Sequence, residues 1–230
     1  SPHPSLPLVK YFYFPGFSAA TGGLLREHDL LVTRDAEIAQ CLRYDTLEIS
    51  LFCYDSAPVG ELLELLAESP TAVRLHVAPG QPLAAVAAHF GGNGPWQCGA
   101  LSVLPFEFLP QEDFDRLLWC CDINFVRGED SFVRAQWAAN TFVWQAYRQA
   151  DEAQLDKVDA FLQRYIAGLS ATGANAAVDL FQAWNSGCGL RQAWESFLAA
   201  RPEITTHNHH WAERLAGNPD LAEALVKFCA

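Results

Sequence analysis

Short apolar runs alternate with stretches of helical spacing along the first two thirds of the chain. Runs of strand length, rich in β-branched and aromatic residues, occur at 9–14, 46–54, 71–78, 100–104, 123–126 and 141–144. Apolar residues three and four positions apart predict helices at 58–68, 82–90, 111–120 and 130–138, with a further short helix from Leu24. Near-continuous apolar strands separated by helices indicate an α/β fold, with a parallel sheet and helices on both faces.

The last third of the chain has helical spacing only. It predicts helices at 153–169, 172–185, 190–200, 205–216 and 219–229. We expect the closing helices to pack on the sheet or on a missing neighbour. The chain has no Met and begins with the Pro-rich residues SPHPSLPL. We therefore interpret residues 1–8 as a linker or a junction, and the chain as part of a longer protein that starts at a domain boundary.

Composition excludes several classes of function. Of the 230 residues 50% are hydrophobic, and the formal net charge of −12 comes without any run of Lys or Arg, which argues against a nucleic-acid or membrane-surface partner. No apolar run approaches the roughly 18 residues that span a bilayer, and no signal peptide is evident. The seven cysteines are odd in number and form no CxxC pair. They predict reduced thiols in a cytoplasmic protein, with Cys120 and Cys121 as small core residues.

Two polar features are weaker candidates for a site. Gly22 and Gly23 either open a helix whose backbone N–H groups face an anion, or form a tight turn that needs positive φ. His207, His209 and His210 favour a surface tract over a metal site, because no Cys or carboxylate stands at ligand spacing.

The strongest candidate is the polar cluster from Arg127 to Ser131, which lies where an apolar strand ends and a helix begins. In an open α/β sheet, ligands bind at that carboxyl edge. A pyrophosphate would use the backbone amides of Asp130 and Ser131, the Ser131 hydroxyl and the Arg127 guanidinium. Glu129 and Asp130 would then face hydroxyls or a developing positive charge, since carboxylates repel phosphate. The alternative is that Asp130 or Ser131 caps the helix and a surface ion pair completes the cluster.

Three long motifs carry a resemblance to a known family. FPGF followed by TGGLLRE, LPFEFLPQEDFDRLLWCCDINFVRGEDS, and FVRGEDSFVRAQWA followed by FVWQAY resemble the EarP family of bacterial protein-arginine rhamnosyltransferases, which modify elongation factor P. The likeness runs from about Tyr11 to Val226. It implies a GT-B glycosyltransferase with two Rossmann-like domains that face each other across a cleft, and an inverting transfer of rhamnose from dTDP-β-L-rhamnose to an arginine of elongation factor P.

This chain resembles the C-terminal half of that family, with extra C-terminal helices. The resemblance implies a nucleotide-sugar-binding Rossmann-like domain at 9–200, and C-terminal helices at 201–230 that pack on the missing N-terminal domain. The aspartate thought to act as base belongs to that N-terminal domain. We therefore expect this chain to hold the donor without transferring sugar alone, and its partners to be elongation factor P and its own N-terminal domain.

The resemblance also implies roles for single residues. Phe108 would stack on the thymine, and Gln111 would hydrogen-bond the edge of the base. For Phe108 the alternative is a buried core aromatic. Arg127, Asp130 and Ser131 would hold the diphosphate and neighbouring donor groups.

Glu129 would lie nearest the reacting sugar and is the candidate catalytic residue, acting on the transition state or orienting a sugar hydroxyl. Tyr147 would contact the diphosphate from the next strand–helix junction. No DxD-type metal site is evident, so we expect neither a metal nor another cofactor. Three other hypotheses for the function remain open: a non-catalytic nucleotide-sugar-binding module, a GT-B sugar-nucleotide epimerase, and a protein-interaction scaffold without nucleotide binding.

Overall fold

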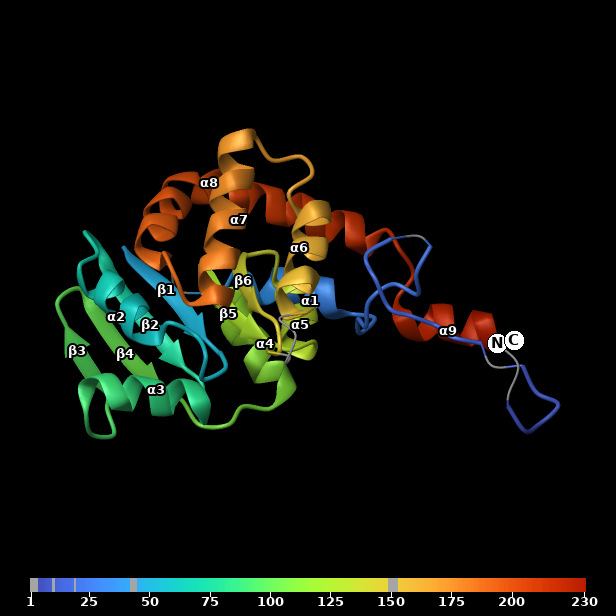
Figure 1. The fold of residues 1–230 in the computed structure, drawn as a ribbon, viewed down its shortest axis with the longest axis horizontal. Coiled ribbons are helices and arrows are strands. Elements are labelled where there is room, and N and C mark those ends of the chain that lie inside the picture. The colour runs from blue at the N-terminus through green and yellow to red at the C-terminus, as the bar shows by residue number, and fades with distance from the viewer. Residues whose placement is uncertain (1–3, 10, 19, 42–44, 149–152) are drawn as a thin grey trace.

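The computed structural model describes residues 4–9, 11–18, 20–41, 45–148 and 153–230. Within these residues the chain forms a six-stranded sheet with the order β3-β4-β2-β1-β5-β6 (Figure 1). All neighbouring strands are parallel except β3, which is antiparallel to β4. The strands are β1 (Thr46–Leu51), β2 (Ala72–Val77), β3 (Trp96–Cys98), β4 (Leu101–Pro105), β5 (Ile123–Arg127) and β6 (Thr141–Gln145).

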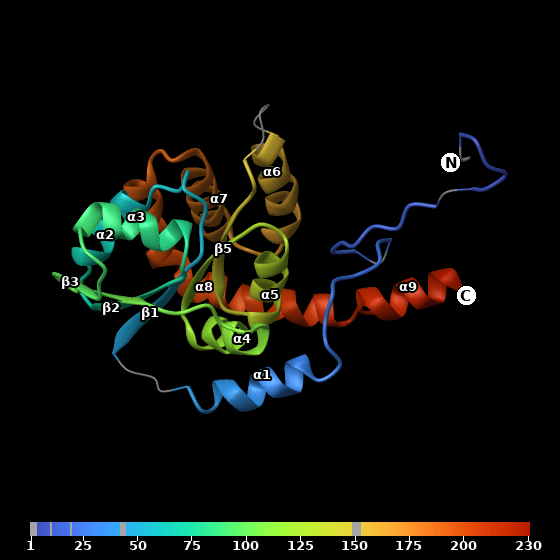
Figure 2. The same cartoon turned by 90° about the horizontal axis from the view of Figure 1, so that it is seen from below.

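Helices cover both faces of this sheet (Figures 1 and 2). Three of them connect consecutive parallel strands: α2 (Val59–Ala67), α4 (Gln111–Cys120) and α5 (Asp130–Ala138); α3 (Gln81–Phe90) leads from β2 to the antiparallel strand β3. The others described are α1 (Leu30–Ile38), α6 (Ala153–Tyr165), α7 (Ala171–Ser186), α8 (Leu190–Ala216) and α9 (Leu221–Cys229). α2, α7 and α8 lie on one face, and α4 and α5 on the other with α1 outside α4. The predicted α/β architecture, with a mainly parallel sheet, is therefore confirmed.

The sheet is wound in two directions from its middle. From β1 the chain steps outward through β2 to β4, and then returns across the sheet to β5 and steps outward the other way to β6. β1 and β5 are thus neighbours whose following loops diverge, which is the switch point at which open α/β sheets bind ligands. Buried polar side chains mark this pairing, because Ser50 lies opposite Asn124 and its hydroxyl donates to the Asn124 Oδ1 at 2.6 Å.

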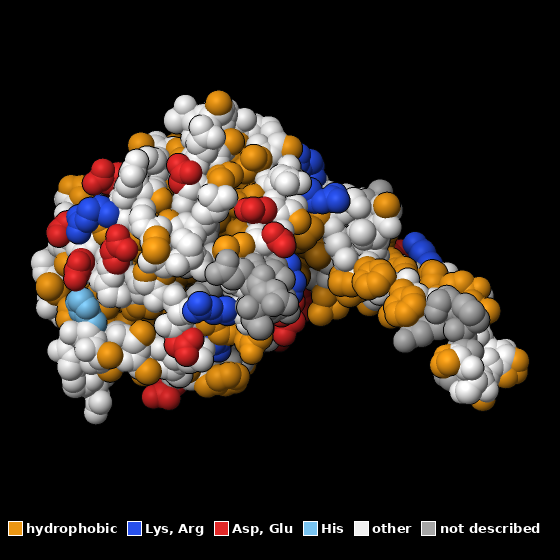
Figure 3. Space-filling model, viewed as in Figure 1, with side chains coloured by type: hydrophobic (Ala, Val, Ile, Leu, Met, Phe, Trp, Pro, Cys, Tyr) orange, Lys and Arg blue, Asp and Glu red, His pale blue; other side chains and the backbone are white. Residues whose placement is uncertain are grey.

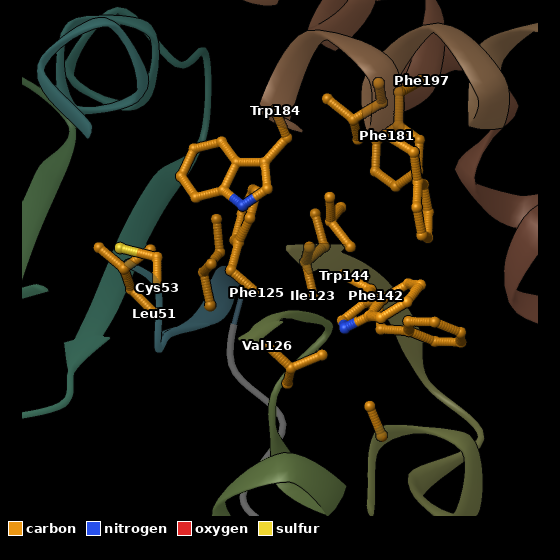
Figure 4. Packing of buried hydrophobic residues seen from close by; sticks show 14 of the residues in the cluster. Leu51, Cys53, Ile123, Phe125, Val126, Phe142, Trp144, Phe181, Trp184 and Phe197 are labelled. Atoms are coloured by element: carbon orange, nitrogen blue, oxygen red, sulfur yellow. The ribbon is translucent and has the colours of Figure 1, made fainter. Parts of the chain in front are cut away.

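On the face covered by α7 and α8, buried side chains of these two helices pack on the central strands (Figure 4). Trp184 of α7 is fully buried, with its ring centroid 4.4 Å from that of Phe125 on β5. Phe181 of α7 and Phe197 of α8 are also buried above the strands. α7 and α8 therefore contribute directly to the core of the sheet.

The two ends of the chain form an arm that extends away from the sheet (Figures 1 and 3). We use this name for the described residues of 4–14 together with 217–230; Phe17 already packs on Phe132 of α5, with ring centroids 5.8 Å apart. Tyr13 packs on Phe228 of α9 with ring centroids 4.9 Å apart. Large apolar side chains nevertheless stay exposed along the arm, among them Tyr11, Phe14 and Val226. Among the described residues, no helix combines the length and apolarity that a bilayer crossing requires.

Several predicted elements differ from the structure. The strand predicted at 9–14 is wrong, because Tyr11 to Phe14 lie in the arm with no ladder partner in the described residues. The helix predicted from Leu24 begins only at Leu30. The helices predicted at 190–200 and 205–216 are one helix, α8, which continues through Pro202 because residues on both sides of it pack on the domain. β3 was not predicted, since its three residues carry no periodic signal.

The predicted cysteine chemistry is wrong for one pair. Cys41, just after α1, and Cys120, the last residue of α4, form a disulfide across 79 residues of sequence. Cys121 is buried as predicted. The pairing depends on α1 packing against α4, which neither the number nor the spacing of the cysteines reveals.

This pairing predicts the thiol count of the purified chain. Under denaturing, non-reducing conditions a thiol reagent should titrate five groups, because two of the seven cysteines are joined. After reduction it should titrate all seven. Seven free thiols before reduction would contradict the pairing.

The packing of α7 on the sheet predicts a large cost for truncating its central side chain. We expect Trp184→Ala to lower the free energy of unfolding by about 3–5 kcal/mol, the usual loss for a buried large aromatic. Urea denaturation followed by circular dichroism measures it. Val32→Ala, at an exposed position of α1, is the control and should change stability by less than about 0.5 kcal/mol. Similar losses in both variants would show that α7 does not hold the core.

Candidate functional site

An open cavity of about 470 Å³ lies at the carboxyl edge of the sheet, at the switch point. The loops after β1, β2, β4 and β5 meet there with the first turns of α4 and α5. The lining residues are Phe52, Ala78, Pro79, Phe106, Phe108, Leu109, Pro110, Gln111, Phe114, Arg127, Asp130, Ser131 and Arg134. Its volume is in the range of small-molecule and cofactor sites.

A second cavity, of about 340 Å³, lies at the opposite edge of the sheet. Asp45, Glu48, Asp122 and Arg201 are among its lining residues. The amino edge of a parallel sheet presents neither strand-to-helix loops nor the starts of the crossover helices. We therefore place the candidate site at the carboxyl edge.

The turn from β5 into α5 is closed by a small set of hydrogen bonds. The Ser131 hydroxyl donates to the Arg127 carbonyl at 2.6 Å and accepts from the Arg127 N–H at 3.1 Å. Gly128 has φ of 65°, its N–H donates to the Gln145 carbonyl at 3.2 Å, and its carbonyl accepts from the Trp144 indole at 2.7 Å. These bonds fix the path of the backbone, and glycine is required at the centre of the turn.

The start of α5 has no side-chain cap. Glu129 is the N-cap residue, and no side chain accepts from the first N–H groups of the helix. The alternative that Asp130 or Ser131 caps this helix is therefore wrong. Uncapped N–H groups and the positive end of the helix dipole form an arrangement that binds anions. The Ser131 hydroxyl is already engaged with Arg127, so the group it offers an anion in this conformation is its backbone N–H.

Arg127 is held between two aromatic rings beside this helix start. Its guanidinium carbon lies 4.3 Å from the ring centroid of Phe52 and 4.6 Å from that of Tyr54. It also donates to the side-chain oxygen of Gln81, the first residue of α3. The cation–π contacts and this hydrogen bond fix a positive charge on the wall of the cavity.

The wall of the cavity also has apolar side chains and one exposed aromatic ring. Phe108 lies in the loop between β4 and α4, and 87% of its surface is exposed. The alternative of a buried core residue is therefore wrong. An exposed ring on the wall of a cavity is available to stack on a planar ligand. Gln111, the first residue of α4, lies beside it on the same wall.

A partly buried ion network, which the sequence did not predict, adjoins this wall through Arg134. Arg134 of α5 donates from Nε to the Asp115 carboxylate at 2.8 Å and through a second nitrogen to its other oxygen. Its remaining nitrogen donates to both carboxylate oxygens of Glu27, at 2.7 and 3.0 Å. Burial lowers the pKa of Arg134, but the hydrogen bonds to both carboxylates outweigh burial and raise it above its usual value. The network thus ties α4, α5 and the segment before α1 together.

Glu129 and Tyr147 lie outside the residues that line the cavity. The Tyr147 ring makes an edge-on contact with Tyr54, at 5.5 Å between centroids. Burial raises the pKa of the Tyr54 phenol, Arg127 opposes the rise, and the Glu129 carboxylate and Tyr147 add to it. Tyr54 thus contacts both Arg127 and Tyr147, whereas five predicted residues line the cavity itself: Phe108, Gln111, Arg127, Asp130 and Ser131.

The weaker candidates do not form sites in the described part of the chain. Gly22 and Gly23 open no helix: Gly23 has the positive φ, 75°, that the turn alternative requires, and the Gly22 N–H closes a longer loop by donating to the Phe14 carbonyl. His207 is buried and bonds the Tyr165 carbonyl, so the prediction of a surface tract is wrong for it, whereas His209 and His210 are exposed. The described residues contain no cluster of His, Cys, Asp or Glu able to hold a metal.

Sequence reasoning missed the aromatic rings that hold Arg127. The apolar run predicts a strand at 46–54 that includes Phe52 and Tyr54, but β1 ends at Leu51 and both residues lie in the loop at its carboxyl edge. The sequence signal for them was the pair of alternating aromatic residues at the end of this apolar run, next to the predicted carboxyl edge of the sheet. Asp115 and Arg134 gave no such signal, because they are 19 residues apart and meet only through helix packing.

The doubly wound sheet, with its cavity at the switch point, defines a Rossmann-like α/β protein. Comparison with known proteins then identifies the family. A sequence model described as "Elongation-Factor P (EF-P) rhamnosyltransferase EarP" matches residues 1–230. The chain belongs to the EarP family.

Individual relatives agree with this assignment. Proteins named "Protein-arginine rhamnosyltransferase" from Pseudomonas putida and Pseudomonas aeruginosa are both 42% identical, over 99% and 97% of this chain. The chain spans 65% and 64% of their lengths. A solved structure, described as "Structural basis for EarP-mediated arginine glycosylation of translation elongation factor EF-P", matches with a TM-score of 0.83 and 39% identity. That match covers 94% of this chain and 75% of the solved one.

The geometry of the turn before α5 predicts the effect of adding one methyl group there. We expect Gly128→Ala to cost more than the roughly 1–2 kcal/mol of a left-handed L-residue, because its Cβ would lie 3.1 Å from the Tyr54 hydroxyl. Gly189→Ala is the matched control, since Gly189 has a similar φ of 79° and open space around a Cβ. Urea unfolding of both variants measures the difference. Equal losses in the free energy of unfolding would mean that the Tyr54 hydroxyl does not limit the space for a side chain at position 128.

Proposed function

We propose that this chain binds dTDP-β-L-rhamnose as the C-terminal, donor-binding part of a GT-B protein-arginine rhamnosyltransferase whose acceptor is elongation factor P. Membership of the EarP family and the names of the relatives support the reaction. The solved relative, described as acting on EF-P, supports the acceptor.

The observation that carries the proposal is the set of groups on the wall of the cavity at the switch point. The wall has the exposed ring of Phe108 and the amide of Gln111. It also has Arg127, held against two rings, and the uncapped start of α5. A nucleoside diphosphate needs both kinds of group, since it joins a planar base to an anionic diphosphate. The base would stack on Phe108 and bond Gln111, and the diphosphate would meet Arg127 and the N–H groups of Asp130 and Ser131.

The residues on the far side of Arg127 would face the sugar. In this proposal Tyr147 contacts the diphosphate from the β6–α6 junction, and Glu129 lies nearest the rhamnose. A carboxylate there stabilises an oxocarbenium-like transition state, in which positive charge develops on the ring. It also accepts hydrogen bonds from sugar hydroxyls.

Transfer to arginine requires more than donor binding. Inversion needs in-line attack on the anomeric carbon, opposite the departing dTDP. A guanidinium is a poor nucleophile because it stays protonated at neutral pH, so a carboxylate must take or share a proton as the bond forms. The leaving diphosphate gains charge, which Arg127 and the start of α5 would stabilise. This part of the proposal uses no metal.

We assign the proton-accepting carboxylate to an N-terminal domain, which makes this chain alone a donor-binding protein without transfer activity. The arm would lie against that domain, since apolar side chains such as Tyr11, Phe14 and Val226 stay exposed on it. The whole enzyme would be cytoplasmic, where its acceptor functions in translation.

Calorimetric titration with nucleotides tests the proposal. The chain should bind dTDP in preference to UDP and ADP. Loss of base stacking in Phe108→Ala should weaken dTDP binding by about tenfold or more, because such stacking contributes about 1–3 kcal/mol. Arg127→Ala tests the diphosphate end and should also weaken dTDP binding, because it removes the guanidinium that the diphosphate would meet. Phe14→Ala is the matched control, since it removes an exposed ring from the arm and should leave the affinity unchanged.

The outcomes separate the competing functions. Preference for UDP would favour a sugar-nucleotide epimerase, and absence of binding to any nucleotide would favour an interaction scaffold. Selective dTDP binding with no effect of Phe108→Ala would place the base elsewhere. A transfer assay tests the other part of the proposal. Rhamnosylation of elongation factor P should require an added N-terminal domain. Transfer by this chain alone would contradict the assignment of the proton-accepting carboxylate to that domain.

A further inference from the structure

The amide of Gln111 has a fixed direction. Its Nε2 donates to the Asp115 Oδ1 at 3.0 Å, one helical turn further along α4. Asp115 is 4% exposed, and both of its carboxylate oxygens also accept from Arg134. No described residue donates to the Oε1 of Gln111, which remains available to the cavity that Gln111 lines.

The chemistry of Asp115 sets that direction. An ionised carboxylate only accepts hydrogen bonds, and the paired contacts with Arg134 keep the charge in place. A flipped Gln111 amide would bring its oxygen against the carboxylate and lose the hydrogen bond. Asp115 thus accepts one of the two N–H bonds of Gln111 and leaves the other N–H and Oε1 as an adjacent donor and acceptor.

An oriented amide distinguishes the edges of pyrimidine bases. Thymine and uracil have a donor at N3–H beside an acceptor oxygen at O4, whereas cytosine has an acceptor at N3 beside a donor amino group. A glutamine free to rotate complements both patterns equally, because its oxygen and nitrogen exchange places. A glutamine with a fixed order complements one pattern and opposes the other.

We propose that Asp115, held by Arg134, is a positioning residue that makes the cavity select thymine and uracil nucleotides against cytosine nucleotides by fixing the amide direction of Gln111. The proposal rests on the function proposed above, in which Gln111 faces the base. Asp115 does not touch the ligand: it lines the neighbouring cavity on the other side of Gln111, with Glu27 and Thr33.

The network around Asp115 is built for this role. Arg134 is 7% exposed, and its hydrogen bonds to Glu27 help to hold the guanidinium against the Asp115 carboxylate. Burial raises the pKa of Glu27, but its hydrogen bonds with Arg134 bring the pKa below its ordinary value. Glu27 therefore stays charged at neutral pH.

The test compares dUDP with dCDP, which have the same sugar and phosphates and differ only at the base edge. In calorimetry the wild-type chain should bind dUDP at least about tenfold more tightly than dCDP, since mismatched polar groups in a site are left unpaired. In Asp115→Asn, the amide introduced at position 115 can either accept a hydrogen bond from the Gln111 amide or donate one to it. The Gln111 amide can then adopt both orientations. The ratio should fall to about threefold or less, with dCDP binding more tightly than it does to wild type.

Gain of dCDP binding is the informative result, because a merely damaged pocket would lose both ligands. Asp113→Asn is the matched control, on the same helix and paired only with the surface residue Arg116 among the described ion pairs. It should keep the wild-type ratio. If the single variant does not fold, the double variant Asp115→Asn with Arg134→Gln replaces both charged partners by neutral amides. Its ratio of dUDP to dCDP affinity then tests the same prediction.

Three results would overturn the inference. Equal binding of dUDP and dCDP by the wild type would show that the amide does not read the base. Proportional loss of both ligands in Asp115→Asn would reduce Asp115 to a structural role while leaving the proposed function intact. No binding of dTDP, dUDP or dCDP to the wild type would remove the proposed function, and the inference with it.

Discussion

The pairing of β1 with β5 is the constraint on which the rest of the structure depends. It joins strands that lie more than seventy residues apart in sequence, in the register Ile49↔Ile123, and one buried polar pair, Ser50 with Asn124, fits only that register. The polar side of the candidate site follows from it. The loop after β1 brings Phe52 and Tyr54 to the loop after β5, where Arg127 lies between them. A shift by one residue would turn the buried faces of both strands around.

The parts of the fold that sequence predicted well are those whose pattern is local and whose environment is uniform. α4 and α5 begin and end at the predicted residues because an amphipathic repeat is bounded by Pro110 on one side and by a tight turn on the other. The predictions at the ends of the chain were wrong for the opposite reason. Tyr11 to Phe14 have strand composition but no neighbouring strand, and the helix break expected near Pro202 is overridden by packing on both sides of it.

The candidate site shows the same division between local and distant information. Arg127 to Ser131 form one contiguous stretch, so the sequence alone placed them at a strand–helix junction. The pairing of Asp115 with Arg134 could be predicted only from the packing of α4 on α5. The disulfide between Cys41 and Cys120 likewise depends on the packing of α1 on α4. A pair of buried opposite charges is invisible in a one-dimensional pattern, since each charge alone is typical of a solvated helix face.

The turn before α5 has a thermodynamic consequence for binding. Its backbone is tied to the Ser131 hydroxyl, to β6 through the Gln145 carbonyl, and to the Trp144 indole. Fixing a residue in one conformation costs about 1–2 kcal/mol of entropy, and here folding has already met that cost. An anion that docks on this turn loses its own freedom of motion but orders almost no protein, so most of the electrostatic attraction remains as affinity.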